Sequence, residues 1–212
     1  MLRKTFITSI LSIMMFCLTS IVVSAEDKTP HEIIEHTSTE VLSALRNDAE
    51  AIKNNPNKIN DLVDEIILPI CDVERMGKYI LAKHWKTASE KQRTAFVTEF
   101  KKILIRNYGR HLAEYSNATV EVMPEKLTEE KLYQTVSTEL DTKIGSKPFQ
   151  VDYVFRVTED SSKVVDVKIE GMSILKTFRT AFTQEIAETS LSELIERITL
   201  VNQPALAMNT SH

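Results

Sequence analysis

The sequence predicts an α+β fold with a helical N-terminal half, an antiparallel sheet and C-terminal helices, in that order. Apolar residues recur at helical spacing from about residue 30 to residue 115. From about residue 119 to residue 170 they alternate with polar residues, which is typical of half-buried strands. Helical spacing returns after Ser173. Helices and strands that occupy separate stretches of a chain indicate an α+β protein.

The first 25 residues are typical of a secretory signal peptide. Arg3 and Lys4 precede an apolar run from about Phe6 to Val23, and a small-residue cleavage site ends at Ala25. A retained membrane anchor is the alternative, but the run is short and contains several serines and threonines. The sequence therefore predicts export and removal of residues 1–25.

Cleavage would leave one domain at residues 26–200 and a flexible tail at residues 201–212. Cys17 would be removed with the signal peptide, and lipid attachment there is not expected because Phe16 precedes it instead of a small residue. Cys71 would then be the single cysteine of the exported chain. We therefore expect a domain stabilised by its hydrophobic core and not by an internal disulfide.

Capping residues mark where the helices of the first half begin. The segment Thr29-Pro30-His31-Glu32 combines an N-cap hydroxyl, a proline at the first helical position and a capping-box acid. This helix is expected to end at the asparagines of residues 54–57. Two further amphipathic helices are expected, one before Pro69 and one after Asp72.

The longest predicted helix begins at a second capping box, formed by Ser89 and Gln92. Large apolar and aromatic side chains share one stripe of this helix, at Phe96, Phe100, Leu104, Tyr108 and Leu112. We expect it to form the central wall of the domain.

Four strands are predicted in the second half. The first contains Val120 and Val122, and the others cover about residues 132–140, 149–157 and 163–170. The last three are joined by connections short enough for an antiparallel meander. One face of this sheet is aliphatic and aromatic. Packed on the long helix, this face would enclose either a solid core or a cavity. Periodicity does not distinguish the two, because core-facing and lipid-facing side chains are chemically alike.

The strand, Gly171, Ser173 and following helix resemble the nucleophile elbow of hydrolases. That turn needs a small residue two places after the serine, and here the residue is Leu175. Ser173 is therefore interpreted as the N-cap of a helix that begins near Ile174.

Other patterns for catalysis or metal binding are weak. A hydrolase would need a nucleophile, a base and an acid, and the available groups are Cys71, Ser173, His84, His111, Asp72 and Asp166. No sequence spacing places these groups together. The chain has no H-E-x-x-H motif, no paired cysteine spacing and neither of the two common nucleotide-binding glycine motifs. Neither an enzyme nor a metal site is predicted.

The charge of the chain is uneven. Without Arg3 and Lys4, 24 basic side chains face 30 acidic ones, so nucleic acid is not an expected partner. From Lys83 to Tyr115, however, eight basic side chains face three acidic ones. This stretch is either an ordinary solvated helix face or a surface that meets anionic headgroups or an acidic partner.

Two blocks of the sequence match a known family pattern. The first block is LPICDVERMGKYILAKHWKTASEKQRTAFVTEFKKILIRNYGRHLAEY, at residues 68–115. The second is VVDVKIEGMSILKTFRTAF, at residues 164–182. Together they resemble the MlaC family of periplasmic phospholipid carriers, also known as toluene-tolerance auxiliary components. Two positions depart from the family pattern, which usually has a glycine at the place of Ala82 and a tryptophan near Val164.

The resemblance implies a soluble periplasmic protein that holds the acyl chains of a glycerophospholipid in an apolar cavity between helices and sheet. Its partners would be an outer-membrane lipoprotein complex and an inner-membrane ABC transporter with an MCE-type lipid-binding subunit. Its role would be to maintain outer-membrane lipid asymmetry. The resemblance implies no catalytic residue, metal or cofactor, and the phospholipid is the cargo. Exposing about 30 acyl methylenes to water at roughly 0.8 kcal/mol each costs on the order of 20 kcal/mol, so a carrier is needed.

Candidate cavity residues follow from this implied function, with ordinary core packing as the alternative for each of them. They are Phe100, Leu104, Tyr108, Val136, Val151, Tyr153, Phe155, Val167, Ile169, Met172 and Ile174. Arg179 is the candidate for a phosphate contact at the cavity mouth, and pairing with an acidic side chain is its alternative. Because acyl chains dominate such binding, weak headgroup selectivity is expected. The alternative function is a periplasmic chaperone or adaptor that binds apolar protein segments.

Overall fold

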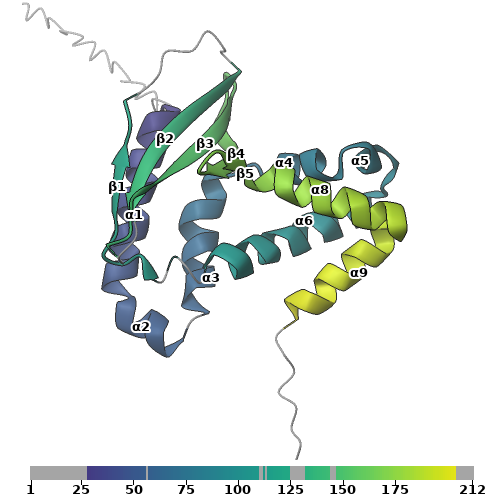
Figure 1. The fold of residues 1–212 in the computed structure, drawn as a ribbon, viewed down its shortest axis with the longest axis horizontal. Helices are drawn as coiled ribbons and strands as arrows, with labels where there is room; N and C mark the ends of the chain where they lie inside the picture. Colours follow the sequence, from purple (N-terminus) through teal and green to yellow (C-terminus); the bar gives the residue numbers. More distant parts are fainter. Residues whose placement is uncertain are drawn as a thin grey trace, which may run out of the picture.

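The structure, a computed structural model, describes residues 28–55, 57–109, 112, 114–124, 132–143 and 147–203. The predicted signal peptide at residues 1–25 lies outside these ranges, as do His111 and residues 204–212 of the predicted tail. Figure 1 shows the sheet and helix α1 (Pro30–Asn47) at one end of the molecule and a group of helices at the other.

A five-stranded antiparallel sheet confirms the predicted α+β class. Its strands are β1 (Thr119–Val122), β2 (Tyr133–Asp141), β3 (Phe149–Val157), β4 (Ser162–Ile169) and β5 (Met172–Ser173), and they follow each other across the sheet in chain order.

The predicted number of four strands is wrong because β5 is too short for residue alternation to reveal. Its two residues pair with the end of β4, Ser173 with Lys168 and Met172 with Ile169. The turn between the strands consists of Glu170 and Gly171, with φ angles of 49° and 77°. Glycine adopts this left-handed conformation without steric cost, so Gly171 allows the chain to reverse within two residues.

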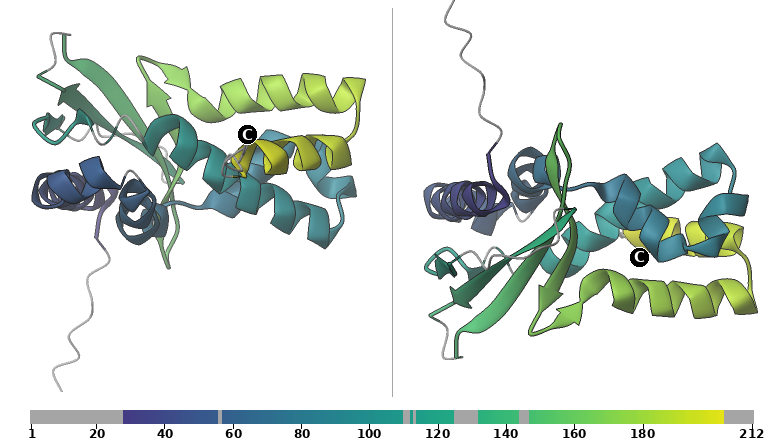
Figure 2. Two further views of the ribbon diagram at one scale, coloured as in Figure 1. Left: turned by 90° about the horizontal axis from the view of Figure 1, so that it is seen from below. Right: turned by 90° about the horizontal axis from the view of Figure 1, so that it is seen from above.

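Helix α1 lies against the sheet, as Figures 1 and 2 show from three directions. The predicted capping box is confirmed, since the Glu32 amide donates to Thr29 Oγ1 at 3.2 Å and the Thr29 amide donates to Glu32 Oε2 at 2.8 Å. The buried side of α1 includes Ile34, Val41 and Leu45.

After α1 the chain is broken into short helical segments. These are α2 (Ala49–Asn54), α3 (Lys58–Leu62), the π-helical segment η1 (Val63–Ile67) and the 3₁₀ turn η2 (Leu68–Ile70). The backbone then pairs with the sheet, because the Asp72 amide donates to the carbonyl of Val164 in β4 at 2.9 Å. The start of the next helix is thereby fixed next to β4.

The helical end of the molecule is built from α4 (Val73–Leu81), α5 (Lys83–Thr87), α6 (Glu90–Leu104), α8 (Ile174–Glu188) and α9 (Leu191–Asn202). Figure 2 shows α8 and α9 running alongside α6 and α4. The predicted N-caps Ser89 and Ser173 are confirmed, and Asp72 caps the helix that was predicted to follow it. Helix α9 continues to Asn202, two residues into the predicted tail, and Asn202 Nδ2 donates to the Glu99 carbonyl at 2.9 Å.

Helix α6 is the predicted central helix, but it ends earlier than its apolar stripe suggested. The regular helix stops at Leu104 and a π-helical segment, η3 (Ile105–Gly109), continues it. The first part of α6 packs in an aromatic cluster with α8, in which the Phe96 and Phe100 ring centroids lie 6.0 Å apart and those of Phe100 and Phe178 lie 5.3 Å apart. This cluster forms the centre of the main core.

Candidate functional site

An apolar cavity of about 230 Å³ lies where the two ends of the molecule meet. Its wall comes from η1, η2, α4, the end of α6, η3, β4 and the first turn of α8. The lining residues are Val63, Ile67, Leu68, Cys71, Val73, Met76, Leu104, Ile105, Tyr108, Gly109, Leu112, Val167, Ile169, Ile174 and Leu175. Not one of them carries a formal charge at neutral pH, so the cavity suits an apolar ligand.

The cavity lies between two separate hydrophobic clusters. The main core contains the aromatic rings and contributes side chains such as Met76, Leu104 and Leu175 to the wall. A smaller cluster under α1 contributes side chains such as Val63 and Ile105. The wall is therefore built from side chains of two clusters that meet at the cavity.

Both π-helical segments border the cavity. Val63 and Ile67 come from η1, and Ile105, Tyr108 and Gly109 come from η3. Segments of π-helix are rare and are frequently found at functional sites. A Cβ atom at Gly109 would lie 3.0 Å from Ile59 Cγ2, so glycine permits the close approach of η3 to α3.

Five of the eleven predicted cavity residues lie in this wall, namely Leu104, Tyr108, Val167, Ile169 and Ile174. Tyr108 lies at the rim, where 37% of the residue is exposed. Burial raises the pKa of its phenol above the ordinary 10.0, so the ring remains neutral below that pH.

The other six predicted residues lie outside the wall. Phe100, Val136 and Phe155 are packed in the main core, and Tyr153 packs against it. Val151 is buried within the sheet, opposite Thr138. Met172 is 70% exposed because β5 is an edge strand. Sequence periodicity, helical for Phe100 and alternating for the strand residues, identifies an apolar face but not whether that face is filled by other side chains.

Sequence reasoning missed the part of the wall formed by residues 63–76. Val63 and Ile67 belong to the amphipathic helix predicted before Pro69, and the sequence pattern places Leu68, Ile70 and Cys71 on no particular surface. The sequence does contain a signal for this part of the wall, because its apolar residues follow one another too densely to fit on one face of a short helix. That signal indicates a segment that contacts apolar groups on two sides.

A second hollow, the polar cleft, adjoins the cavity. It measures about 380 Å³ and is lined by Arg75, Lys78, Tyr79, Tyr133, Val154, Val165, Asp166 and Leu175. Leu175 belongs to both walls. Arg179 lies beside the cleft and not over the cavity, since its guanidinium carbon is 5.0 Å from the centre of the Tyr79 ring. This contact is a cation–π interaction.

The two candidate nucleophiles, Ser173 and Cys71, have structural contacts here. The Ser173 hydroxyl donates to Asp166 Oδ2 at 2.6 Å and accepts from the Lys176 amide at 2.9 Å, as an N-cap does. Burial raises the pKa of the Cys71 thiol to about 12, although nearby Lys163 acts in the opposite direction. Its sulfur donates to the Ile67 carbonyl at 3.4 Å. A neutral thiol is a poor nucleophile.

Within the described residues, no hydrogen bond joins His84 to Cys71 or Ser173, and no group of three or more His, Cys, Asp or Glu side chains is placed to hold a metal ion. The same part of the chain contains no helix with the length and apolar character that crossing a bilayer requires.

An α+β fold that surrounds an apolar cavity with helices and one side of a sheet is typical of proteins that bind an apolar ligand. Comparison with known proteins identifies the family within this class. The chain belongs to the MlaC protein family, whose model matches residues 35–199. The resemblance recognised in the sequence is thereby confirmed.

Two characterised relatives are similar over most of their length. The toluene tolerance protein ttg2D of Pseudomonas putida is 31% identical over 156 residues, which cover 73% of this chain and 72% of that protein. The intermembrane phospholipid transport system binding protein MlaC of Haemophilus influenzae is 24% identical over 170 residues, covering 78% of this chain and 79% of that protein.

A solved structure has the same fold. It is the phospholipid-binding protein from Ralstonia solanacearum in complex with a phospholipid, and it matches with a TM-score of 0.76. The sequence identity is 23%, and the match covers 82% of this chain and 97% of that one.

Proposed function

We propose that this protein is a periplasmic carrier that holds the acyl chains of a glycerophospholipid in the apolar cavity. The observation that carries the proposal is the wall of that cavity, whose described residues carry no formal charge and come from two hydrophobic clusters. The phospholipid bound by the Ralstonia protein of the same fold supports it. So does the name of the Haemophilus relative, a binding protein of an intermembrane phospholipid transport system.

The size of the cavity implies that its wall moves when lipid binds. A cavity of about 150 Å³ accommodates benzene, which has six carbons. By that measure 230 Å³ accommodates about nine carbons, roughly a third of the about 30 methylenes in two acyl chains. We expect the wall to widen between η1 and η3 on one side and β4 on the other, because the two clusters meet there.

The polar cleft is the place proposed for the phosphate. Arg75 and Lys78 line it, and Arg179 lies beside its Tyr79 wall. Arg75 is already paired with Asp72, whose Oδ2 accepts from Arg75 Nε at 3.1 Å, so Lys78 is the cation more readily available. A contact to phosphate alone would be common to all glycerophospholipids, which accords with the weak headgroup selectivity expected from the sequence.

The proposed route of the lipid runs between the outer-membrane lipoprotein complex and the inner-membrane ABC transporter with its MCE-type subunit. The basic stretch from Lys83 to Tyr115, which contains α5 and α6, is the proposed surface for docking to one of them. Delivery requires the cavity to open at a partner, because a tightly held lipid otherwise dissociates too slowly.

Organic extraction of protein purified without detergent, followed by mass spectrometry, tests the proposal. We expect about one glycerophospholipid per chain, with a mixture of headgroups. Protein that is folded yet yields no phospholipid when extracted from its native periplasm would contradict the proposal.

A bulky side chain in the wall tests the location of the acyl chains. Val167→Trp should project into the cavity and lower lipid occupancy, with little loss of stability because the hollow accommodates the indole ring. The control is Val136→Trp, where the side chain is 6% exposed and lies in the filled core. Overpacking there should cost about 1–3 kcal/mol or more of unfolding free energy. Full lipid occupancy in a folded Val167→Trp variant would place the lipid elsewhere.

A further inference from the structure

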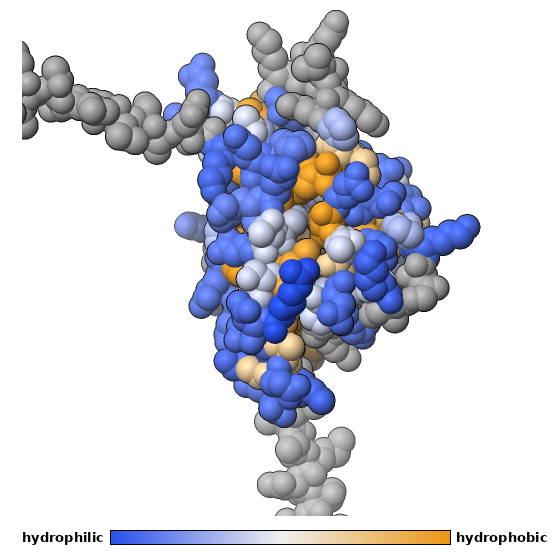
Figure 3. All heavy atoms as spheres, turned by 90° about the vertical axis from the view of Figure 1, so that its left-hand side faces the viewer, coloured by the Kyte–Doolittle hydropathy of each residue, from blue (hydrophilic) through white to orange (hydrophobic). Residues whose placement is uncertain are grey.

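A wide groove separates α1 from β1 on the face opposite the helical end. It has a volume of about 1,340 Å³ and is lined by one side of α1, the three residues Val120, Glu121 and Val122 of β1, and Ile66 of η1. Figure 3 shows apolar residues in the middle of this face, between hydrophilic margins. The groove is separate from the apolar cavity, because no residue in the described part of the chain lines both.

Among the residues that the structure describes, no backbone group pairs with the outer edge of β1 along this groove. Strand β1 is the first strand of the sheet, and its described pairing partner is β2. The Met123 amide donates to the Ser137 carbonyl at 2.9 Å, and the register continues with Glu121 opposite Glu139. In an antiparallel pair, hydrogen-bonded residues alternate with residues whose N–H and C=O point the other way. Val120 and Val122 therefore present their backbone groups to the open edge.

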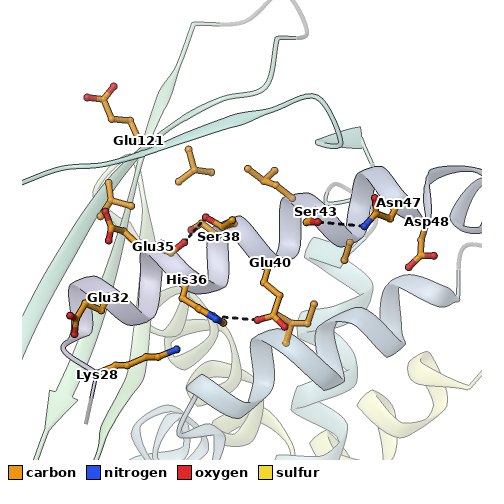
Figure 4. Close-up of a pocket in the computed structure, with 16 residues that line it drawn as sticks. Lys28, Glu32, Glu35, His36, Ser38, Glu40, Ser43, Asn47, Asp48 and Glu121 are labelled. Carbon is orange, nitrogen blue, oxygen red and sulfur yellow. Dashed lines mark hydrogen bonds and ion pairs between the residues drawn. The ribbon is translucent and has the colours of Figure 1, made fainter. Parts of the chain in front are cut away.

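The charges along the edge are unbalanced. Glu121 and Glu139 lie directly opposite each other, and among the described residues neither carboxylate has an ion-pair partner. Such a like-charged cross-strand pair is destabilising. Figure 4 shows Glu121 on the strand, with Glu35 and Glu40 on the nearby helix α1. The groove lining contains five carboxylates, one lysine and one histidine, His36, whose Nδ1 is 3.5 Å from Glu40 Oε2.

These charges restrict what can bind the edge. A second copy of this chain would bring a second row of carboxylates to the first. An anionic membrane surface would be repelled in the same way. An extended protein segment with basic side chains would instead pair with the free backbone groups and neutralise Glu121 and Glu139.

We propose that the open edge of β1 binds an extended, basic segment of a partner protein, which adds a sixth strand to the sheet. The side chain opposite Glu121 is Lys or Arg, and the neighbouring side chains point into the groove toward Leu42 and Ile66. This binding does not depend on the proposed carriage of lipid, because it uses the opposite face of the molecule.

The test uses the mature protein and a synthetic probe peptide, acetyl-Thr-Lys-Val-Lys-Val-Lys-Thr-amide. We expect saturable binding by calorimetry, with amide chemical-shift changes centred on Val120 and Val122. Two further peptides, one with Glu in place of Lys and one with N-methylated alternate residues, should not bind.

Two variants of the protein test separately how backbone pairing and charge contribute to peptide binding. Val122→Pro removes an outward-facing N–H and leaves the β1–β2 bonds intact, which edge strands tolerate. Glu121→Lys reverses the charge at the edge. Each substitution should lower the affinity of the protein for the Lys peptide by about tenfold or more. The matched control Glu196→Lys, on the exposed side of α9, should leave the affinity unchanged.

Three outcomes would overturn the proposal. These are absence of Lys-peptide binding, equal binding of the Glu peptide, and unchanged affinity in a folded Val122→Pro variant. Sedimentation of the mature protein alone provides a fourth test. A dimer that disappears in Val122→Pro would show that a second copy occupies the edge, against the proposal. The lipid content of each sample, measured by extraction, reports on the proposed carrier function separately.

Discussion

Ala82 has a backbone conformation that alanine rarely adopts. Its φ is 47° and its ψ is −114°, at the junction where α4 ends and α5 begins. The pattern of the family usually has a glycine at this position. The structure gives the physical reason for that pattern, because glycine has no Cβ to clash in this conformation.

Ala82→Gly should therefore stabilise the protein. Relief of the strained conformation is worth about 1–3 kcal/mol, and the greater flexibility of glycine in the unfolded chain offsets part of it. Urea unfolding of the two proteins measures the difference. The control is Ala181→Gly in the exposed interior of α8, which should lower stability by about 1 kcal/mol. Equal losses at both positions would show that Ala82 is not strained.

Cys71 gives a prediction about pH. Burial raises the pKa of its thiol from 9.0 to about 12, so the folded protein holds this proton more tightly than the unfolded chain does. The stabilising effect is complete below pH 9 and is lost as the pH rises toward 12. At pH 8 we expect iodoacetamide to label Cys71 in urea but very slowly in the folded protein. Fast labelling of the folded protein would contradict the burial of the thiol in the cavity wall.

At the scale of elements, α6 combines two environments along one helix. Its first turns carry Phe96 and Phe100 into the aromatic cluster, whereas Leu104 at its end faces the cavity. The sequence predicted both sets from the same stripe. Helical periodicity shows which face of a helix is buried, but not whether the space beyond that face is filled.

Alanine substitutions should distinguish the two environments. Phe100 is fully buried, so Phe100→Ala should cost about 3–5 kcal/mol of unfolding free energy. Leu104→Ala should cost less, because part of its surroundings is already hollow, and it should change lipid occupancy. Urea unfolding and lipid extraction measure the two effects. A larger loss of stability in Leu104→Ala than in Phe100→Ala would contradict this division.

The helix starts were predicted from sequence because capping is a local interaction. Thr29, Ser89 and Ser173 each use a side-chain oxygen for an amide three residues later. The short strand β5 and the π-helical segments were not predicted, since neither has a pattern of its own over so few residues. The cavity depends on how two distant clusters meet, and no local signal contains that information.

At the scale of the whole molecule, the two ends differ in charge as well as in structure. The groove at the sheet end is acidic, whereas the stretch with α5 and α6 at the helical end is basic. This separation of charge between the two ends is expected to orient the molecule as it approaches a charged surface. Steering of this kind weakens as salt is added.

Removal of lipid should lower the thermal stability of the whole protein. Ligand that binds only the folded state stabilises it by about 4 kcal/mol at a concentration of about 1,000 times Kd. We therefore expect delipidated protein to melt at a lower temperature and to recover when phospholipid vesicles are added, as measured by calorimetry. Identical melting with and without lipid, in samples whose lipid content is verified, would contradict binding to the folded state.

Leu175 borders the apolar cavity and the polar cleft at the same time, with only 3% of its surface exposed. It occupies the first turn of α8, immediately after the cap that Asp166 and Ser173 hold in place. Any displacement of Leu175 that enlarges the apolar cavity must also change the shape of the adjoining polar cleft. Lipid that enters the cavity would thus shift the first turn of α8. A spectroscopic label on the exposed side of α8 would therefore report lipid binding and release in real time.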